Sequence, residues 1–162
     1  MIHPSLLKRR KPIERRSTPI KRTTRIKARR TVGLPGLINK LDDLFAAYVK
    51  ERDGNYCITC PGRPEGRNWH AGHFIQRRRM SLRFDPKNVH SQCGVPCNKF
   101  RHGAPAEYAL AILDRYGEAE LRRLMARKAL LKKWTRPELE RLIAAIQRSG
   151  AEFEMAYYET EL

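Results

Sequence analysis

Four cysteines in two short pairs constrain the fold of this chain more than any other feature. Cys57 and Cys60 are separated by two residues, Cys93 and Cys97 by three, and 32 residues lie between the pairs. Each pair can present two thiolates from one tight turn, and a metal ion can join the two turns, as in tetrahedral four-thiolate zinc sites. A complete set of four thiolates leaves no open coordination position. We therefore expect a Zn²⁺ ion that stabilises the fold and takes no part in chemistry.

Residues 54–103, which hold these cysteines, lack helical periodicity. They also contain four of the five histidines, and a short apolar piece, 69–75, suits a strand. A small β-ribbon cannot bury enough surface to fold alone and needs a metal or a larger partner. The expected metal would supply that support.

Helical patterns stand on both sides of this segment. Apolar residues recur at helical spacing over 37–52, and again in stripes around 108–113 and 121–125 with Gly117 between them. Thr135 and the Glu three residues later have capping-box spacing and open a further helix. The chain is therefore expected to be α+β, with a single domain over residues 36–162: an N-terminal helix, a core at about 54–103 and a helical cap at about 104–160.

The charge of the chain is high and unevenly placed. The formal net charge is +17, and residues 1–30 alone carry twelve Lys or Arg against one acid. With three prolines and no sustained hydrophobic period, residues 1–35 are expected to form a disordered basic arm. Such an arm suits an electrostatic clamp on phosphates, and a solubilising tail is the alternative. Nucleic acid is therefore the favoured partner.

Membrane insertion is excluded by the same composition. No apolar run approaches the roughly 18 residues that a membrane span requires, and no apolar region follows the first basic residues as in a secretory leader. We expect a cytoplasmic protein. In such a reducing compartment, four cysteines are expected to bind metal rather than form disulfides.

Histidine and asparagine side chains around the cysteines are the candidates for chemistry. His70 and His73 lie in the expected first strand, Asn88 precedes the second cysteine pair, and Asn98 follows it directly. Phosphodiester hydrolysis needs a base that activates water and a cation that stabilises developing charge. Imidazole and amide groups could supply both, but the residue types alone leave hydrolysis and simple nucleic-acid binding equally open.

The order of these residues resembles a known nuclease motif. A Cys-x2-Cys pair, His73 at the end of a strand, Asn88 five positions before Cys93, and Asn98 after the last cysteine resemble the HNH or ββα-metal endonucleases with an embedded zinc. With asparagine at its last position, the motif also resembles that of the phage endonuclease VII resolvase. More narrowly, residues 40–155 resemble the phage NinG (Rap) recombination proteins, a family associated with cutting branched DNA. The segments that carry this resemblance are ERDGNYCITC, WHAGHF, LRFDPKNVHSQC, CNK and KWTRPEL.

The resemblance implies a zinc-stabilised ββα-metal (HNH-like) core and assigns roles to single residues. His73 corresponds to the general base, and Asn88 to the residue that orients the base or fixes the loop. Asn98 corresponds to a ligand of a catalytic Mg²⁺ or Mn²⁺. The family normally has an acid beside the base, where this chain has Gly72. His70 is the expected replacement, and its imidazole would favour Mn²⁺.

Basic residues near these positions are expected to contact DNA. Arg77, Arg78, Arg79 and Arg83 follow the base histidine and suit a phosphate clamp, and Lys99 and Arg101 follow Asn98. A solvated surface run is the alternative. His90 and His102 are expected to be structural or to face phosphate.

Taken together, these features predict a metal-dependent endonuclease. Its substrate would be a branched recombination intermediate of the Holliday-junction or D-loop type. Two cuts at a junction are compatible with a homodimer, and other recombination proteins are conceivable partners. The alternative is a non-catalytic, zinc-stabilised DNA- or RNA-binding protein, including one that acts in RNA processing.

Overall fold

The computed structural model describes residues 32–160, and the chain divides at Thr31 into two units of which the second is described. Most of the arm expected over residues 1–35 lies outside the described residues. Its last two positions, Leu34 and Pro35, form the start of the first helix, three residues earlier than the pattern predicts. Proline is compatible with a helix at this point because the first turn needs no amide hydrogen from it.

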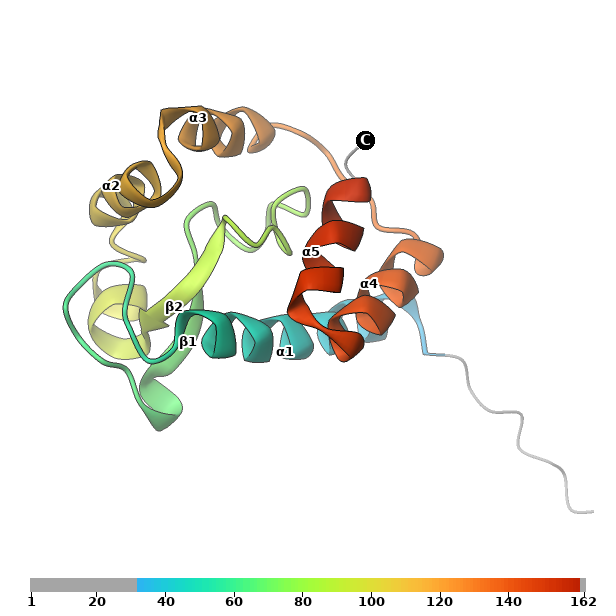
Figure 1. The fold of residues 1–162 in the computed structure, drawn as a ribbon, viewed down its shortest axis with the longest axis horizontal. Helices are drawn as coiled ribbons and strands as arrows, with labels where there is room; N and C mark the ends of the chain where they lie inside the picture. Colours follow the sequence, from blue (N-terminus) through green and yellow to red (C-terminus); the bar gives the residue numbers. More distant parts are fainter. Residues whose placement is uncertain (1–31, 161–162) are drawn as a thin grey trace, which may run out of the picture. The chain divides into compact units, whose positions relative to one another are not determined.

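Helices surround a small two-stranded sheet, which confirms the expected α+β class (Figure 1). In chain order the elements are α1 (Leu34–Asp53), η2 (Gly66–Asn68), β1 (Trp69–His73), β2 (Val89–Cys93), η3 (Gly94–Phe100), α2 (Pro105–Tyr116), α3 (Glu118–Arg127), α4 (Arg136–Arg148) and α5 (Gly150–Glu159). Within this range no helix has the length and apolar character needed to cross a bilayer.

The sheet is an antiparallel ribbon in which Trp69 pairs with Cys93 and His73 with Val89. Strand β2 is buried along its whole length, whereas β1 is mostly half-buried and exposes only His70. Directly after β2 the chain enters η3, a seven-residue helical segment of π type. Two strands followed by a helical segment therefore bring residues 69–73, 89–93 and 94–100 together.

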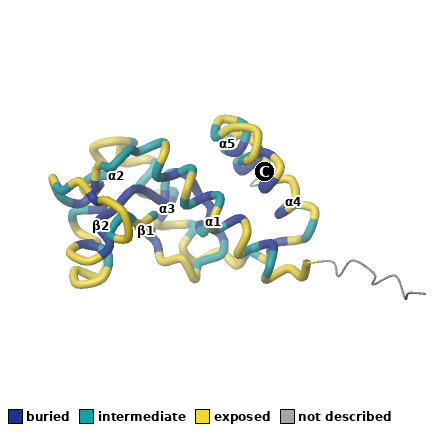
Figure 2. The backbone as a smooth tube through the Cα atoms, turned by 90° about the horizontal axis from the view of Figure 1, so that it is seen from below, coloured by how far each residue is buried: buried dark blue, intermediate teal, exposed yellow. Residues whose placement is uncertain are grey.

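The larger core lies between α1 and the last two helices. Residues 37, 41, 45 and 49 of α1 are buried and lie one turn apart, so they form a single stripe. This stripe packs against apolar residues of α4 and α5, including Leu142 and Phe153. Figure 2 shows that buried and exposed residues alternate along these helices.

A second apolar cluster joins α2 and α3 to the segment that connects the two strands. Tyr108, Ile112 and Leu124 pack with Ile75 and Leu82 of that segment. The chain turns between the two helices at Gly117, whose φ of 83° is a conformation that glycine adopts readily. The expected break between these two helical stripes is thus confirmed.

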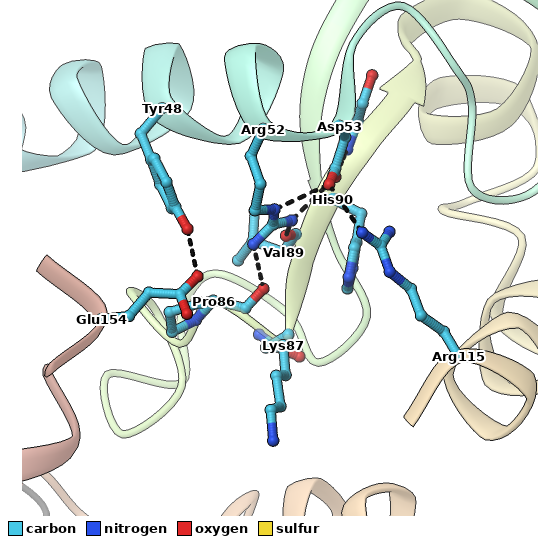
Figure 3. A network of polar contacts seen from close by, with 12 residues as sticks. Tyr48, Arg52, Asp53, Pro86, Lys87, Val89, His90, Arg115 and Glu154 are labelled. Atoms are coloured by element: carbon cyan, nitrogen blue, oxygen red, sulfur yellow. Dashed lines mark hydrogen bonds and ion pairs between the residues drawn. The ribbon is translucent and has the colours of Figure 1, made fainter. Parts of the chain in front are cut away.

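Polar contacts attach the ribbon to the end of α1 (Figure 3). The Arg52 guanidinium donates to the Val89 and Pro86 carbonyls at 2.8 and 2.7 Å. The neighbouring Asp53 carboxylate accepts the Ser91 amide hydrogen at 2.9 Å and pairs with Arg115 of α2. These bonds place β2 against α1 and thereby fix the position of the candidate site.

Candidate functional site

The four cysteine side chains meet at one place. Their Sγ atoms all lie within 4.8 Å of one another, and none forms a disulfide. The distance between the Cys60 and Cys93 Sγ atoms is 3.8 Å. Ligands of a tetrahedral Zn²⁺ at a Zn–S distance of about 2.3 Å lie about 3.8 Å apart. The cluster therefore fits a metal such as zinc, as the spacing predicts.

Local backbone geometry holds these thiols in place. The Gly62 amide donates to Cys60 Sγ and the Cys93 amide to Cys57 Sγ, both at 3.3 Å. A side chain at position 62 would approach Cys60 Sγ to 3.1 Å and Cys93 Sγ to 3.2 Å, so glycine suits this close turn. Amide hydrogens directed at sulfur favour thiolates.

Electrostatics around the thiols also favours a cation. Burial raises the pKa of the Cys57 thiol, but hydrogen bonds from Thr59 and from the Cys93 amide outweigh it and lower the pKa to about 6. Burial and the neighbouring Cys57 raise the pKa of Cys93 to about 12. Four thiolates this close cannot all form unaided, and a divalent cation would remove that repulsion.

His73 ends strand β1, as expected, and its imidazole is half-buried. Its Nε2 lies 3.1 Å from the Arg83 carbonyl oxygen. A carbonyl only accepts, so Nε2 carries the hydrogen and Nδ1 keeps a lone pair. Burial lowers the pKa of His73 to about 4. The ring is therefore neutral at pH 7 and has one nitrogen able to accept a proton.

Asn88 is fully buried just before β2 and holds the connecting segment. Its Oδ1 accepts the Ile75 amide hydrogen at 2.7 Å, and its Nδ2 donates to the carbonyls of Ile75 and Leu82 at 3.0 and 2.9 Å. These bonds fix the loop that follows His73 and make no contact with the histidine ring. Of the two roles implied for Asn88, its geometry fits the one that fixes the loop.

His70 and Asn98 are brought together although 28 positions separate them. Asn98 Nδ2 lies 3.3 Å from His70 Nδ1, and His70 Nε2 lies 3.1 Å from the Arg67 carbonyl oxygen. Gly94 is packed under this imidazole, since a side chain there would meet His70 Nε2 at 2.6 Å. The pair therefore lies at the surface where β1 meets η3.

Gly72 occupies the position where the resembled nucleases carry an acid. A Cβ atom at this position would lie 2.3 Å from the buried Gln92 Oε1, so the ribbon leaves no room for a side chain. Helix α1 supplies acids to the same region instead, because Asp42 and Asp43 line one pocket with His70 and His73. Sequence reasoning missed these two acids. The only sign of them in the sequence is that two adjacent negative charges occur in a chain that is otherwise strongly basic.

The pocket that contains these residues has a volume of about 670 Å³. It lies along β1 and is bounded by α1 on one side and by the end of η3 on the other. Its lining includes Asp43, His70, His73, Asn98 and His102. The base candidate and both candidate ligands of the catalytic metal thus face one space.

The four arginines of the expected phosphate clamp form two pairs with different surroundings. Arg77 and Arg83 both pair with Asp42, with an Arg77 Nη2 to Oδ2 distance of 2.6 Å and an Arg83 Nε to Oδ1 distance of 3.0 Å. Burial raises the pKa of Asp42, but these two arginines outweigh it and lower the pKa. Arg78 and Arg79 instead line a second pocket.

The two remaining basic candidates lie on the surface at the end of η3 and beyond it. Arg101 pairs with Glu107, whereas the Lys99 ammonium lies 5.8 Å from the Phe100 ring centroid. The next three residues all have positive φ, at 51° for His102, 87° for Gly103 and 50° for Ala104. Left-handed conformations of non-glycine residues are costly and concentrate at functional sites. His102 and Gly103 line both pockets.

The His90 ring is held inside the protein by the hydroxyl groups of two tyrosines. The Tyr108 hydroxyl donates to the Gly72 carbonyl at 2.9 Å, so its oxygen accepts the hydrogen on His90 Nδ1 at 3.1 Å. His90 Nε2 then accepts from the Tyr116 hydroxyl at 2.8 Å. A neutral, fully buried imidazole with both nitrogens bonded is unsuited to exchange protons with a substrate.

Comparison with known proteins finds similarity to proteins of bacteriophages. The chain is similar to Protein ninG of Escherichia phage 933W, with 34% identity over 83 residues, and of Salmonella phage P22, with 34% over 84 residues. It is 32% identical over 83 residues to Protein ninG of Escherichia phage lambda. These alignments cover about half of this chain and 40% of each relative.

No solved structure matches this chain. The family model described as Bacteriophage Lambda NinG protein matches residues 5–154, which is most of the sequence. The matched range includes the cysteine cluster and every residue of the pocket beside β1. The chain therefore belongs to the NinG family.

Proposed function

We propose that this protein is a metal-dependent endonuclease that hydrolyses phosphodiester bonds in branched DNA. One observation carries the proposal: His73, His70 and Asn98 line one pocket beside a β–β–helix arrangement. A base and metal-binding groups around a single space are what hydrolysis of a phosphodiester requires. The choice of branched DNA follows from the likeness of the motifs to NinG (Rap) recombination proteins. A homodimer and recombination partners belong to the same proposal.

His73 is the proposed general base. With Nε2–H donated to the Arg83 carbonyl, Nδ1 would accept the proton of the attacking water. The lowered pKa of about 4 keeps this nitrogen unprotonated at pH 7. The Arg83 carbonyl fixes the tautomer and the orientation of the ring, as a hydrogen-bonding partner of a catalytic histidine commonly does.

Asn98 and His70 are the residues that would hold the catalytic ion. Within residues 32–160 the cysteines form the only cluster of three or more His, Cys, Asp or Glu ligand atoms. Mg²⁺ is nevertheless commonly held by one or two protein groups together with water and substrate phosphate. The Asn98 amide oxygen fits that pattern, and the His70 imidazole would be accepted by Mn²⁺ more readily than by Mg²⁺. The bound ion would stabilise charge on the phosphate and on the leaving oxygen.

Cleavage of a synthetic four-way DNA junction tests the proposal. With Mg²⁺ or Mn²⁺, wild-type protein should nick the junction, and His73→Ala should lower the rate by about 10²- to 10⁴-fold, the usual contribution of a general base. Junction binding by this variant should stay near the wild-type level. If neither protein cuts with any divalent ion while both bind alike, the chain is the non-catalytic nucleic-acid-binding protein.

RNA competition addresses the remaining alternative. An RNA-processing protein would release the junction when structured RNA is added at equal concentration, whereas a branched-DNA nuclease would retain it. Measuring residual junction binding at several RNA concentrations separates the two.

A further inference from the structure

A second pocket lies next to the proposed active site. It has a volume of about 750 Å³, within the range of about 300–1,000 Å³ that is typical of sites for small ligands. Helices α2 and α3 form one wall, and the segment after β1 forms the other. His73, Gln76, His102 and Gly103 line this pocket and the first one alike, so the two spaces adjoin at the base candidate.

The walls of this second pocket include many apolar groups. Phe74, Ile75, Ala109, Leu121 and Met125 all line it. The Phe74 ring packs on the buried Tyr108 ring, with centroids 5.5 Å apart, and is only half-buried. A ring held from behind and open in front offers a stacking surface for a planar group.

The remaining side chains of the lining give it a positive charge. Arg78, Arg79 and Lys128 line the pocket, and no acid does. Among the described residues, none of these three forms an ion pair. Arg77, Arg83 and Arg101 differ, since each of them is paired with a carboxylate. An apolar pocket with three uncompensated cations suits a flat ring that carries an anionic group.

We propose that this second pocket binds one unpaired DNA nucleotide next to the scissile phosphate. The base would stack on Phe74, and its phosphates would contact Arg78, Arg79 and Lys128. The inference rests on the proposed nuclease function, because it names what distinguishes branched DNA from duplex. A paired base must be extruded at a cost of a few kcal/mol, whereas a nucleotide in the displaced single strand of a D-loop is already unpaired.

Binding to bulged DNA tests the pocket without any cutting. Three probes are compared without added Mg²⁺ or Mn²⁺: a duplex with a one-nucleotide bulge, the same duplex with an abasic bulge, and a fully paired duplex. Stacking of one base is expected to make the base-containing bulge bind about tenfold more tightly than the abasic bulge. Fluorescence anisotropy with labelled duplexes gives this ratio. Equal affinities for the two bulges would overturn the proposal.

A pair of tryptophan variants localises the effect. Ala106 is exposed and lines the pocket, so Ala106→Trp should fill it and reduce the tenfold ratio to about one. Ala119 is exposed on α3 away from the pocket lining, and Ala119→Trp should keep the ratio. A tenfold preference retained by Ala106→Trp would contradict the assignment. Because the ratio is a binding measurement, it can succeed where junction cleavage fails, and the reverse also holds.

Discussion

At the scale of single residues, the buried Asn88 side chain holds the segment between the two strands by hydrogen bonds to its backbone. Its amide satisfies three backbone groups of the buried loop. Asn88→Ala leaves the Ile75 amide and carbonyl without a partner and the Leu82 carbonyl with only the Asp85 amide at 3.3 Å, at about 1 kcal/mol or more for each lost bond. We expect a loss of about 3 kcal/mol in the free energy of unfolding, measured by urea denaturation. Asn98→Ala is the matched control, since that half-exposed amide should cost less than about 1 kcal/mol.

His90 should make the protein sensitive to acid. Burial, and next the charge of Arg52, lower its pKa to about 3, whereas an unfolded histidine has a pKa of about 6.5. Between these values the unfolded chain binds more protons, so stability falls as pH decreases from about 6.5 to 3.

The contribution of His90 has a maximal slope of about 1.4 kcal/mol per pH unit. Urea denaturation at several pH values measures it, and His90→Gln should reduce the slope. His73 acts in the same direction above a pKa of about 4. An unchanged slope in His90→Gln would show that other groups dominate.

The spacing of motif residues predicts some of the site but not its acids. His73 and Asn88 are identified through the resemblance of the motif to HNH nucleases, whose order of residues they match. Asp42 lies 31 positions before His73 on a helix and belongs to no local motif. Only the packing of α1 beside β1 brings it into the pocket and onto Arg77 and Arg83.

At the scale of elements, helix α4 begins with a complete capping box. Thr135 Oγ1 accepts the Glu138 amide hydrogen, and the Glu138 carboxylate accepts the Thr135 amide hydrogen at 2.7 Å. Thr135→Ala should lower the free energy of unfolding by about 1 kcal/mol, which a thermal or urea transition detects. Thr135→Ser keeps the hydroxyl and should stay near wild type. Equal losses in both variants would mean that the methyl group, not the cap, matters.

The start of α4 could be predicted from the sequence, but its separation from α5 could not. The expected cap of residues 104–160 is helical, and Ser149 divides its final part with an extended backbone. At Gly150 a Cβ atom would come within 2.3 Å of the Tyr48 ring on α1. This break therefore depends on how α5 packs on a distant helix, which no local pattern encodes.

At the scale of the whole molecule, the thiol cluster should support folding. Metal analysis is expected to find about one zinc per chain, and chelation should unfold the protein because metal binding and folding are coupled. Circular dichroism during chelator titration measures this. Folded protein that contains no zinc would contradict the four-thiolate assignment.

The basic arm should act on affinity and not on chemistry. Residues 1–30 carry twelve of the 34 Lys and Arg residues. Deleting them should weaken DNA binding and flatten its dependence on salt, because fewer counterions are released. Titrations at several salt concentrations give both quantities. The metal requirement of any cutting should not change, and loss of cutting at saturating DNA would show that the arm shapes the site.

One buried side chain links the thiol cluster to the pockets. Gln92 Nε2 donates to Thr59 Oγ1, beside Cys57, and to the Gly103 carbonyl at 2.8 Å. Gly103 also donates its amide hydrogen to the Cys97 and Asn98 carbonyls. Residues 102–104, which have positive φ, are thus held to the cysteine cluster both through Gln92 and through the Gly103 amide. Under the proposed function, a newly synthesised chain would complete the lining of both pockets only after it binds metal, and a metal-free copy would not cut DNA.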